Sequence, residues 1–376
     1  MENFDELVTE RALRLSDLEA YLRLHRPPEF FRGRYVVLST SGSTGRRGVF
    51  VYSKAEWITA LASIARPIGW AGVRQLPFRR RRMAIVASSA PWHYSTRVGQ
   101  SLSSPFVPAL RIDAGESIGS IVHRLNEWQP EIMAVYPSLL RQLAEEQIAG
   151  RLRIALCDLA TSAEVLTDDT RRRAQDAWQI HVHDVYGATE YAPIAAECSE
   201  GNMHLVEDGA LIEIVDERGR PVPPGAAGER LLLTVFDRFT QPLIRYEMSD
   251  MVRPLAGDCA CGRPFRLIES IEGRLEDVLS FAAREGPGTT VAIHPNIFHE
   301  VLETVPAAGW QVVQERDGLR VRLVGSPHSV SCEALTGQLR QRLDALGALV
   351  PSIRVERAVA LSRGPSGKAP LIERML

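Results

Sequence analysis

The sequence predicts an α/β protein with a large N-terminal domain, made of an α/β part and a β region, and a small α+β C-terminal domain. Apolar strand-like runs alternate with helical patterns as far as about residue 203. From about His204, short strand-like runs are separated by Gly/Pro turns. After Gly273-Arg274, the spacing resembles a β-α-β-β-α-β unit. We therefore place the domains at 1–274 and 275–376.

The elements follow from apolar periodicity and from the Gly/Pro turns between them. In the α/β part we expect strands at 35–38, 49–52, 83–88, 132–136, 152–159 and 180–185, and helices at 13–26, 57–68, 118–128, 138–149 and 168–178. In the β region we expect strands at 211–215, 229–235 and 251–254. In the C-terminal domain we expect helices at 298–303 and 331–346, and strands at 310–315, 319–324 and 353–358.

Composition excludes several function classes. The chain of 376 residues has a net charge of −2, so no basic field indicates a nucleic-acid partner. No apolar run approaches the length of a membrane span, and the acidic start Met-Glu-Asn-Phe-Asp-Glu-Leu does not resemble a signal peptide. Five cysteines, an odd number, fit a reducing compartment better than a disulfide framework. We expect a cytoplasmic protein without membrane or nucleic-acid partners.

The segment Thr40–Gly48, Thr-Ser-Gly-Ser-Thr-Gly-Arg-Arg-Gly, is rich in backbone N–H and hydroxyl donors, which suit phosphate oxygens. It is not a Walker A loop, because it has no lysine and is followed by the strand-like run 49–52 instead of a helix. A P-loop kinase or NTPase is therefore disfavoured. The alternative is an ordinary Ser/Gly loop between two strands.

Lys368 follows the flexible-looking run Arg363-Gly364-Pro365-Ser366-Gly367, and Lys54 is the only other lysine among 44 basic residues. A compact ammonium on a loop can bridge an attacking carboxylate and a phosphate, where the planar arginine fork fits less well. The alternative is a solvated lysine near the chain end.

The ordered motifs together resemble the adenylate-forming superfamily of acyl-CoA synthetases, adenylation domains and luciferases. These motifs are the loop Thr40–Gly48, Ser162-Ala163-Glu164, Asp184–Glu190, Asp250 with the preceding Pro242–Tyr246, Gly273–Asp277, and Ser366-Gly367-Lys368. Within the superfamily, the chain is similar to the phenylacetate-CoA ligase branch in Ala196-Glu197-Cys198, His204 with Asp208, and Cys259–Arg263. The resemblance implies the adenylate-forming enzyme fold and ATP-dependent activation of an acid, expected to be aromatic, as acyl-AMP.

The resemblance also implies roles for individual residues. The triphosphate is held by Thr40, Ser41, Gly42, Ser43, Thr44 and Gly45, and the adenine is surrounded by Ser162, Ala163, Glu164, Asp184, Tyr186, Gly187 and Ala188. Thr189 contacts phosphate or substrate, Glu190 holds Mg²⁺, and the ribose is bound by Asp250 and Arg274. Lys368 is catalytic together with Thr189 and Glu190. The C-terminal domain then rotates about Glu276, and CoA accepts the acyl group. Each residue has a structural alternative: a core tyrosine, a helix-start glutamate, a turn aspartate or a surface charge.

Trp92, His93, Tyr94 and Tyr136 are our candidates for the acid pocket, with ordinary core packing as the alternative. Thiolate and imidazole are preferred zinc ligands, so Cys198, His204, Cys259 and Cys261 are candidates for a structural Zn²⁺ site; the alternative is unrelated turn cysteines. We expect Cys157 in the core and no role for Cys332.

Three departures from the family pattern limit how far the family's properties can be expected of this chain. Only 39 residues precede Thr40, so part of a pocket wall is expected to be missing or supplied by a partner chain in an oligomer. The hinge position carries Glu276, where Asp or Lys is usual. The segment 280–293 predicts a longer hairpin beside the expected CoA tunnel, which leaves open an amine or a carrier-protein thiol as acceptor. A non-catalytic nucleotide-binding homologue is a further alternative.

Overall fold

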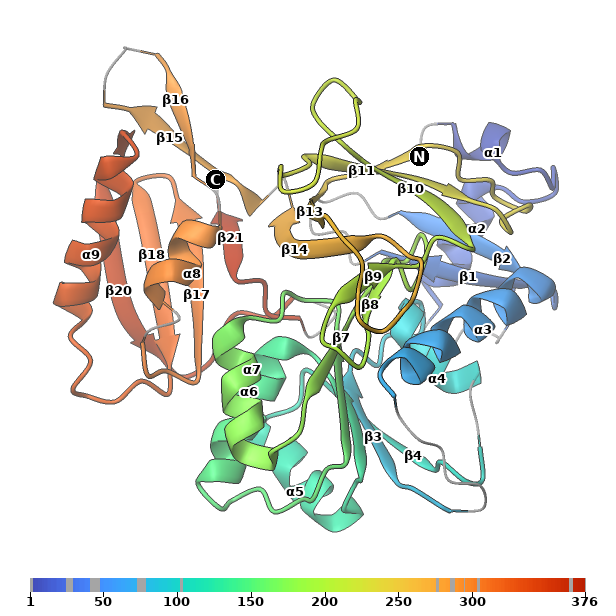
Figure 1. The fold of residues 1–376 in the computed structure, drawn as a ribbon, viewed down its shortest axis with the longest axis horizontal. Coiled ribbons are helices and arrows are strands. Elements are labelled where there is room, and N and C mark those ends of the chain that lie inside the picture. The colour runs from blue at the N-terminus through green and yellow to red at the C-terminus, as the bar shows by residue number, and fades with distance from the viewer. Residues whose placement is uncertain are drawn as a thin grey trace.

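The computed structural model describes residues 3–24, 30–40, 48–72, 79–101, 104–274, 277–284, 288–293, 295–302, 305–364 and 368–375 (Figure 1). Among these residues, the largest sheet has nine strands in the order β13-β14-β9-β8-β7-β6-β5-β3-β4. They are β3 (Met83–Ala87), β4 (Ala109–Asp113), β5 (Ile132–Val135), β6 (Asp158–Ser162), β7 (Val182–Tyr186), β8 (Ala195–Glu197), β9 (Met203–Leu205), β13 (Asp250–Leu255) and β14 (Leu267–Arg274). Strands β3 to β7 are parallel, and the remaining pairs are antiparallel.

Helices lie on both sides of the parallel strands (Figure 1). Helices α5 (Ile118–Trp128), α6 (Pro137–Ile148) and α7 (Asp168–Trp178) share a core with one face of the sheet, which includes Ala84, Val86, Met133 and Val135. On the other side lie α3 (Lys54–Trp70) and α4 (Tyr94–Ser101), and Trp70 packs with Ala196 and Val206.

The N-terminal segment packs α1 (Phe4–Leu7) and α2 (Leu15–Leu22) on the antiparallel hairpin of β1 (Tyr35–Ser39) and β2 (Val49–Ser53). A capping box starts α3, because the Ser53 hydroxyl accepts from Glu56 N and the Glu56 carboxylate accepts from Ser53 N. The other Glu56 oxygen accepts from the backbone N–H groups of Phe239 and Thr240, both at 2.6 Å. One carboxylate therefore ties the hairpin and α3 to the β region.

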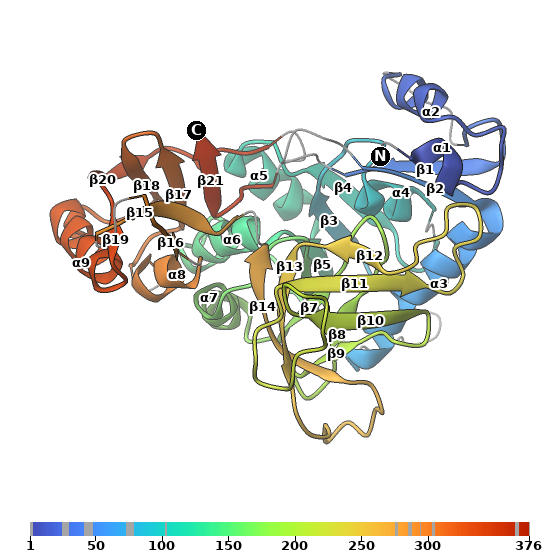
Figure 2. The ribbon, with the colours of Figure 1, turned by 90° about the horizontal axis from the view of Figure 1, so that it is seen from above.

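The β region is an antiparallel sheet of β10 (Ala210–Val215), β11 (Arg230–Val235) and β12 (Tyr246–Met248). After β14, a sheet in the order β20-β18-β17-β21 has its own core with α8 (Asn296–Leu302) and α9 (Cys332–Ala345). Its strands are β17 (Gly309–Glu315), β18 (Gly318–Val324), β20 (Ser352–Ala358) and β21 (Ile372–Met375). This C-terminal sheet lies beside α6 (Figure 2).

A separate hairpin joins β15 (Leu279–Ala283) and β16 (Thr290–Ile293), and β15 also pairs with β19 (Ala348–Leu349). The hairpin predicted in 280–293 is therefore present. The hinge position, Glu276, lies outside the described residues. In the described part of the chain, no helix is both long enough and apolar enough to cross a bilayer.

The strand predicted at 152–159 was wrong, because the pairing strand is β6 at Asp158–Ser162. Leu152, Ile154 and Leu156 are buried as their alternation suggests. Their backbone, however, bonds to side-chain amides: Asn126 accepts from Arg153 N at 2.7 Å, and Gln147 accepts from Ile154 N at 3.2 Å. Cys157, expected in the core, is exposed just before β6.

Candidate functional site

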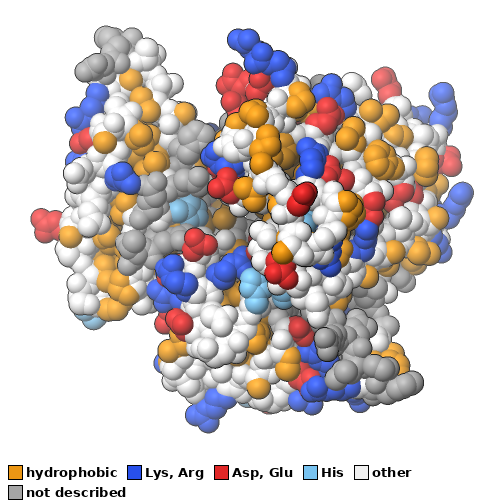
Figure 3. Space-filling model, in the orientation of Figure 1, with side chains coloured by type: hydrophobic (Ala, Val, Ile, Leu, Met, Phe, Trp, Pro, Cys, Tyr) orange, Lys and Arg blue, Asp and Glu red, His pale blue; other side chains and the backbone are white. Residues whose placement is uncertain are grey.

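A continuous cavity of about 2820 Å³ lies at the carboxyl ends of the parallel strands and extends to the C-terminal sheet. Figure 3 shows the surface hollowed between the C-terminal lobe and the rest of the molecule. Ligands of open α/β sheets bind outside the carboxyl ends of the strands, so this position is where a site is expected. Its lining includes Tyr136, Glu190, Asp250 and Lys368, which come from four separate parts of the sequence.

The base of the predicted phosphate loop is closed by backbone and side-chain bonds. Thr40 N donates to Gly48 O at 3.0 Å, and Gly48 N donates to the Thr40 hydroxyl at 2.8 Å. The β1–β2 hairpin confirms that the loop joins two strands. Thr40 and Gly48 line the cavity, whereas the predicted phosphate ligands Ser41, Gly42, Ser43, Thr44 and Gly45 lie outside the described residues.

Ser162 ends β6, and it lines the cavity together with Ala163 and Glu164, which follow the strand. Ala163 has a φ of 73°, a left-handed conformation that L residues seldom adopt and that turns the chain sharply after the strand. The Glu164 carboxylate accepts from Ser138 N at 2.9 Å and from Ala369 N at 3.0 Å. Burial raises the pKa of Glu164, which these N–H groups and Lys368 partly offset. Sequence reasoning missed this side-chain link from Glu164 to the residue after Lys368, since its ends lie 205 positions apart in the sequence.

Asp184 and Tyr186 on β7 line the cavity, and so does Gly187, the residue after the strand. The Asp184 carboxylate accepts from the Thr161 hydroxyl at 2.8 Å. Burial raises its pKa to about 7, and the neighbouring Glu197 carboxylate acts in the same direction. At Gly187, an added Cβ would lie 2.8 Å from the Ala192 Cβ, so this tight turn requires glycine.

The backbone carbonyls of Thr189 and Glu190 accept hydrogen bonds from two side chains. The Tyr52 hydroxyl donates to the Thr189 carbonyl at 2.9 Å, and Arg238 donates to the Glu190 carbonyl at 3.1 Å. The Glu190 carboxylate accepts from the Tyr246 hydroxyl at 3.4 Å and lines the cavity. Burial, followed by the Glu190 charge, raises the pKa of Tyr246 to about 12.

These contacts leave a carboxylate oriented by its neighbours at the cavity wall. Mg²⁺ in nucleotide sites takes one or two carboxylates together with substrate phosphates, so Glu190 fits that ion. Sequence reasoning missed Tyr52 and Arg238. The Pro242–Tyr246 motif contained Tyr246 but gave it no role.

Asp250 and Arg274 are partners in the β13–β14 ladder. Asp250 is the first residue of β13, buried in the fold, and it lines the cavity. The predicted ribose pair therefore lies on adjacent strands although 23 residues separate its members in the sequence.

The Lys368 ammonium lies 5.8 Å from the centre of the Tyr136 ring and lines the cavity. Tyr136 is itself fixed, because its hydroxyl accepts from Ser88 N at 3.0 Å. Lys368 O also accepts from Gly364 N at 2.9 Å, a bond that holds the Lys368 backbone beside Gly364. A cation from the far end of the chain thus reaches the strand ends where Glu164 and Tyr136 lie.

The four candidate acid-pocket residues do not all face the cavity. His93, Tyr94 and Tyr136 line it. Tyr94 packs edge-on against Trp57 with ring centres 5.5 Å apart, and its hydroxyl donates to Ala192 O at 3.4 Å. Trp92 is not among the lining residues; its carbonyl accepts from Ser39 N at 3.0 Å beside the phosphate-loop hairpin.

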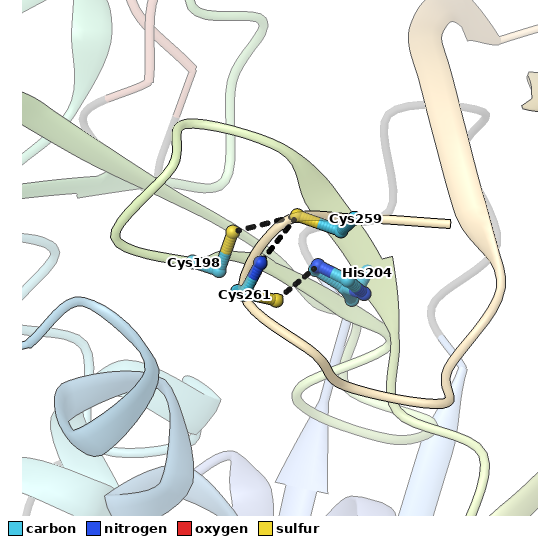
Figure 4. Close-up of side chains that lie close together, drawn as sticks. All are labelled: Cys198, His204, Cys259 and Cys261. Atoms are coloured by element: carbon cyan, nitrogen blue, oxygen red, sulfur yellow. Dashed lines mark hydrogen bonds between the residues drawn. The ribbon is translucent and has the colours of Figure 1, made fainter. Parts of the chain in front are cut away.

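The four candidate zinc ligands lie together, with all ligand atoms within 4.8 Å of one another (Figure 4). The Cys198 and Cys259 sulfurs are 3.7 Å apart, and the Cys261 sulfur is 3.3 Å from His204 Nε2. A Zn–S bond of about 2.3 Å places two thiolates of a tetrahedral site about 3.8 Å apart. His204 Nδ1 lies 3.1 Å from Phe265 O, a contact that fixes the ring and leaves Nε2 toward the sulfurs. The donor set therefore fits zinc.

Comparison with known proteins agrees with this geometry. The model of the AMP-binding enzyme family matches residues 32–233, more than half of the chain. A phenylacetate-coenzyme A ligase from Thermus thermophilus is 26% identical over 294 residues, which cover 75% of this chain and 63% of that protein. A phenylacetate-coenzyme A ligase from Pseudomonas putida is 29% identical over 255 residues, which cover 64% of this chain and 55% of that protein. The chain thus spans less than two thirds of the length of these two relatives.

The structure of 2-hydroxyisobutyryl-CoA ligase in the postadenylation state, in complex with R3-HIB-AMP, matches with a TM-score of 0.71 at 20% identity, over 96% of this chain and 79% of that one. This likeness confirms the predicted fold class. Together with the family match, it confirms the resemblance drawn from the ordered motifs. The chain belongs to the AMP-binding enzyme family.

Proposed function

We propose that the protein activates a carboxylic acid with ATP, releasing pyrophosphate and forming acyl-AMP, and then transfers the acyl group to CoA. One observation carries the proposal: Lys368 lines the same cavity as Glu190, Asp250 and Tyr186. Lys368 supplies a compact cation and Glu190 a carboxylate that can bind a metal ion. Asp250 can accept hydrogen bonds from ribose hydroxyls, and Tyr186 offers a flat ring for a purine.

In the first step, an oxygen of the acid attacks the α-phosphorus and the bond to the β-phosphate oxygen breaks. Lys368 stabilises the charge that develops between the two reactants, while Tyr186 and the turn at Ser162–Glu164 bind the adenine. Asp250 and Arg274 bind the ribose, and Thr40–Gly48 bind the outer phosphates. Glu190 would hold Mg²⁺, which neutralises phosphate charge when bound, and Thr189 orients the substrate.

In the second step, a thiol sulfur attacks the acyl carbon, AMP leaves and the thiol proton passes to solvent. We propose that residues 275–376 form a domain that rotates about Glu276 between the steps. The hairpin β15–β16 follows this position directly and favours, as a second candidate, an amine or carrier-protein thiol as acceptor. A Cys198–His204–Cys259–Cys261 zinc site would then have a structural role, joining the segment after Glu190 to the β13–β14 loop. We also propose a cytoplasmic location, because a reducing compartment keeps these cysteines available as zinc ligands.

Pyrophosphate release across a panel of aryl and alkyl acids, each with and without CoA, tests the proposal. We expect release with at least one acid class, and CoA-dependent AMP formation if CoA is the acceptor. AMP formation only with an amine or a carrier protein would replace CoA. No pyrophosphate release with any acid would indicate a non-catalytic nucleotide-binding protein.

A further inference from the structure

The cavity continues from Tyr136 and Ser162 along the face of the parallel sheet that is turned away from α5, α6 and α7. Successive strand residues point to opposite faces. Ala84, Val86 and Val135 enter the core with those helices, whereas their neighbours Ile85 and Ala134 line the cavity. We call this part the sheet-face chamber; it is bounded by Ile85, Ala134, Ala160 and His183 on the sheet and by Pro67 on α3 and Val98 on α4. Phe106 lies beside the amino end of β3, where its carbonyl accepts from Arg81 N.

Small side chains keep the chamber open on its sheet side. Ala134 pairs in register with both Ile85 on β3 and Ala160 on β6, so the three residues form one row across three strands. All three are only partly buried, in contrast to Ala84 and Met133, which are fully buried on the opposite face. Two alanines side by side leave a groove where larger residues would meet α3 and α4.

The two ends of the chamber differ in chemistry. At the carboxyl ends of the strands, it opens beside Tyr136 and Lys368. At the amino ends, Arg81 pairs with Asp158 and lies 3.4 Å from the Glu131 carboxylate. These paired charges border the far end. The five residues of β6 span about 13 Å at a rise of about 3.3 Å per residue.

We propose that the acid activated by this protein carries an extended apolar tail, longer than a single aromatic ring, that lies in the sheet-face chamber. The inference rests on the proposed function, because Lys368 orients the acid: with the carboxylate beside Lys368, the tail points along β5 and β6. Ligand sites enclose about 300–1,000 Å³, and the whole cavity, from the chamber to the C-terminal sheet, holds about 2820 Å³. The row of Ile85, Ala134 and Ala160 is apolar, so removing alkyl surface from water contributes to the affinity. His183, which pairs in register with Ala160, is the polar residue at the β7 end of this row.

Straight-chain acids from acetate to palmitate, together with benzoate and phenylacetate, test the proposal in a pyrophosphate-release assay. We expect kcat/KM to rise about fourfold per added methylene until the chamber is filled, and then to level off. Ala134→Leu and Ala160→Leu should each lower the ratio of kcat/KM for decanoate to that for butyrate at least tenfold. Ala149→Leu, on the exposed residue after α6, is the matched control and should leave this ratio unchanged.

Two outcomes separate this inference from the proposed function. Highest kcat/KM with benzoate or short acids, and a ratio unaffected by the two alanine substitutions, would overturn the apolar tail and keep adenylation. Calorimetric binding of decanoate is the second measurement. Binding that Ala160→Leu abolishes, without pyrophosphate release from any acid, would support the chamber and overturn adenylation. Absence of both binding and turnover would overturn the chamber as well.

Discussion

Arg141 on α6 donates two hydrogen bonds to the carbonyl of Ala307, through Nε at 2.9 Å and Nη2 at 2.6 Å. Ala307 precedes β17, so this buried contact joins the large sheet to the C-terminal sheet. The third guanidinium nitrogen pairs with Asp169 at 2.6 Å. The contact stabilises the orientation in which Lys368 reaches the cavity.

Arg141→Met should slow ATP–pyrophosphate exchange about tenfold or more, because hydrogen bonds from a buried charged donor contribute about 1.5–3 kcal/mol. Asp169 keeps its contact with Arg173 at 2.7 Å, so the substitution does not leave a buried carboxylate alone. Acyl transfer from preformed acyl-AMP should slow less. Arg151→Met, at an exposed ion pair with Glu146, is the control. Equal slowing of both half-reactions would contradict a role in this orientation.

Lys368→Ala should lower the exchange rate about 100-fold to 1,000-fold, the usual effect of removing one group that stabilises transition-state charge. Nucleotide binding, measured by calorimetry, should change little. Lys54→Ala tests the other lysine, whose ammonium lies 4.4 Å from the Phe30 ring centre, outside the cavity lining. It should retain exchange. An unchanged exchange rate in Lys368→Ala would contradict the proposed mechanism.

Asp184 gives a pH dependence of stability with a defined sign. Its folded-state pKa is raised from 3.8 to about 7 by burial, so the folded protein binds the proton more tightly than the unfolded chain. The resulting contribution to stability is present below about pH 4 and is lost as the pH rises to about 7. The Tm of Asp184→Asn minus the Tm of the wild type should therefore be larger at pH 8 than at pH 5. Thermal unfolding of both proteins at pH 5 and pH 8 measures this difference. The same Tm difference at both pH values would refute the prediction.

The protein should bind one zinc ion per chain at the four-residue cluster, as measured by metal analysis after gel filtration. Cys259→Ser should remove the zinc and lower the Tm, because it deletes one thiolate of the cluster in Figure 4. Cys332→Ser, at the start of α9 and outside the cluster, should change neither. Metal-free protein with an unchanged Tm would argue for unrelated cysteines.

Local patterns predicted the longest helices well, but they missed two eight-residue elements, helix α4 and strand β14. The helices predicted at 118–128 and 168–178 coincide with α5 and α7, because serine and threonine caps and periodic apolar residues mark both. The short strands β8 and β9 were missed, since three residues carry too little alternation. The strand at 152–159 failed because side-chain amides replaced a strand partner, which periodicity cannot reveal.

The same limit applies to the site. Lys368, Glu190 and Asp250 could be found from motif chemistry, and they line one cavity. The groups that position them, such as Tyr246 on Glu190 and Glu164 on Ala369, act across the fold. Their roles depend on tertiary distances that no spacing in the sequence encodes. The open row of Ile85, Ala134 and Ala160 likewise depends on which strands are neighbours.

The pairing of Asp250 with Arg274 also bears on the proposed rotation about Glu276. Both residues lie on one rung of an antiparallel ladder, and the chain leaves the large sheet directly after Arg274. Across the ladder, the cavity wall at Asp250 is the direct neighbour of this point of departure. The proposed rotation of the C-terminal segment would therefore start beside a residue whose backbone is held by pairing with β13, a strand that lines the cavity.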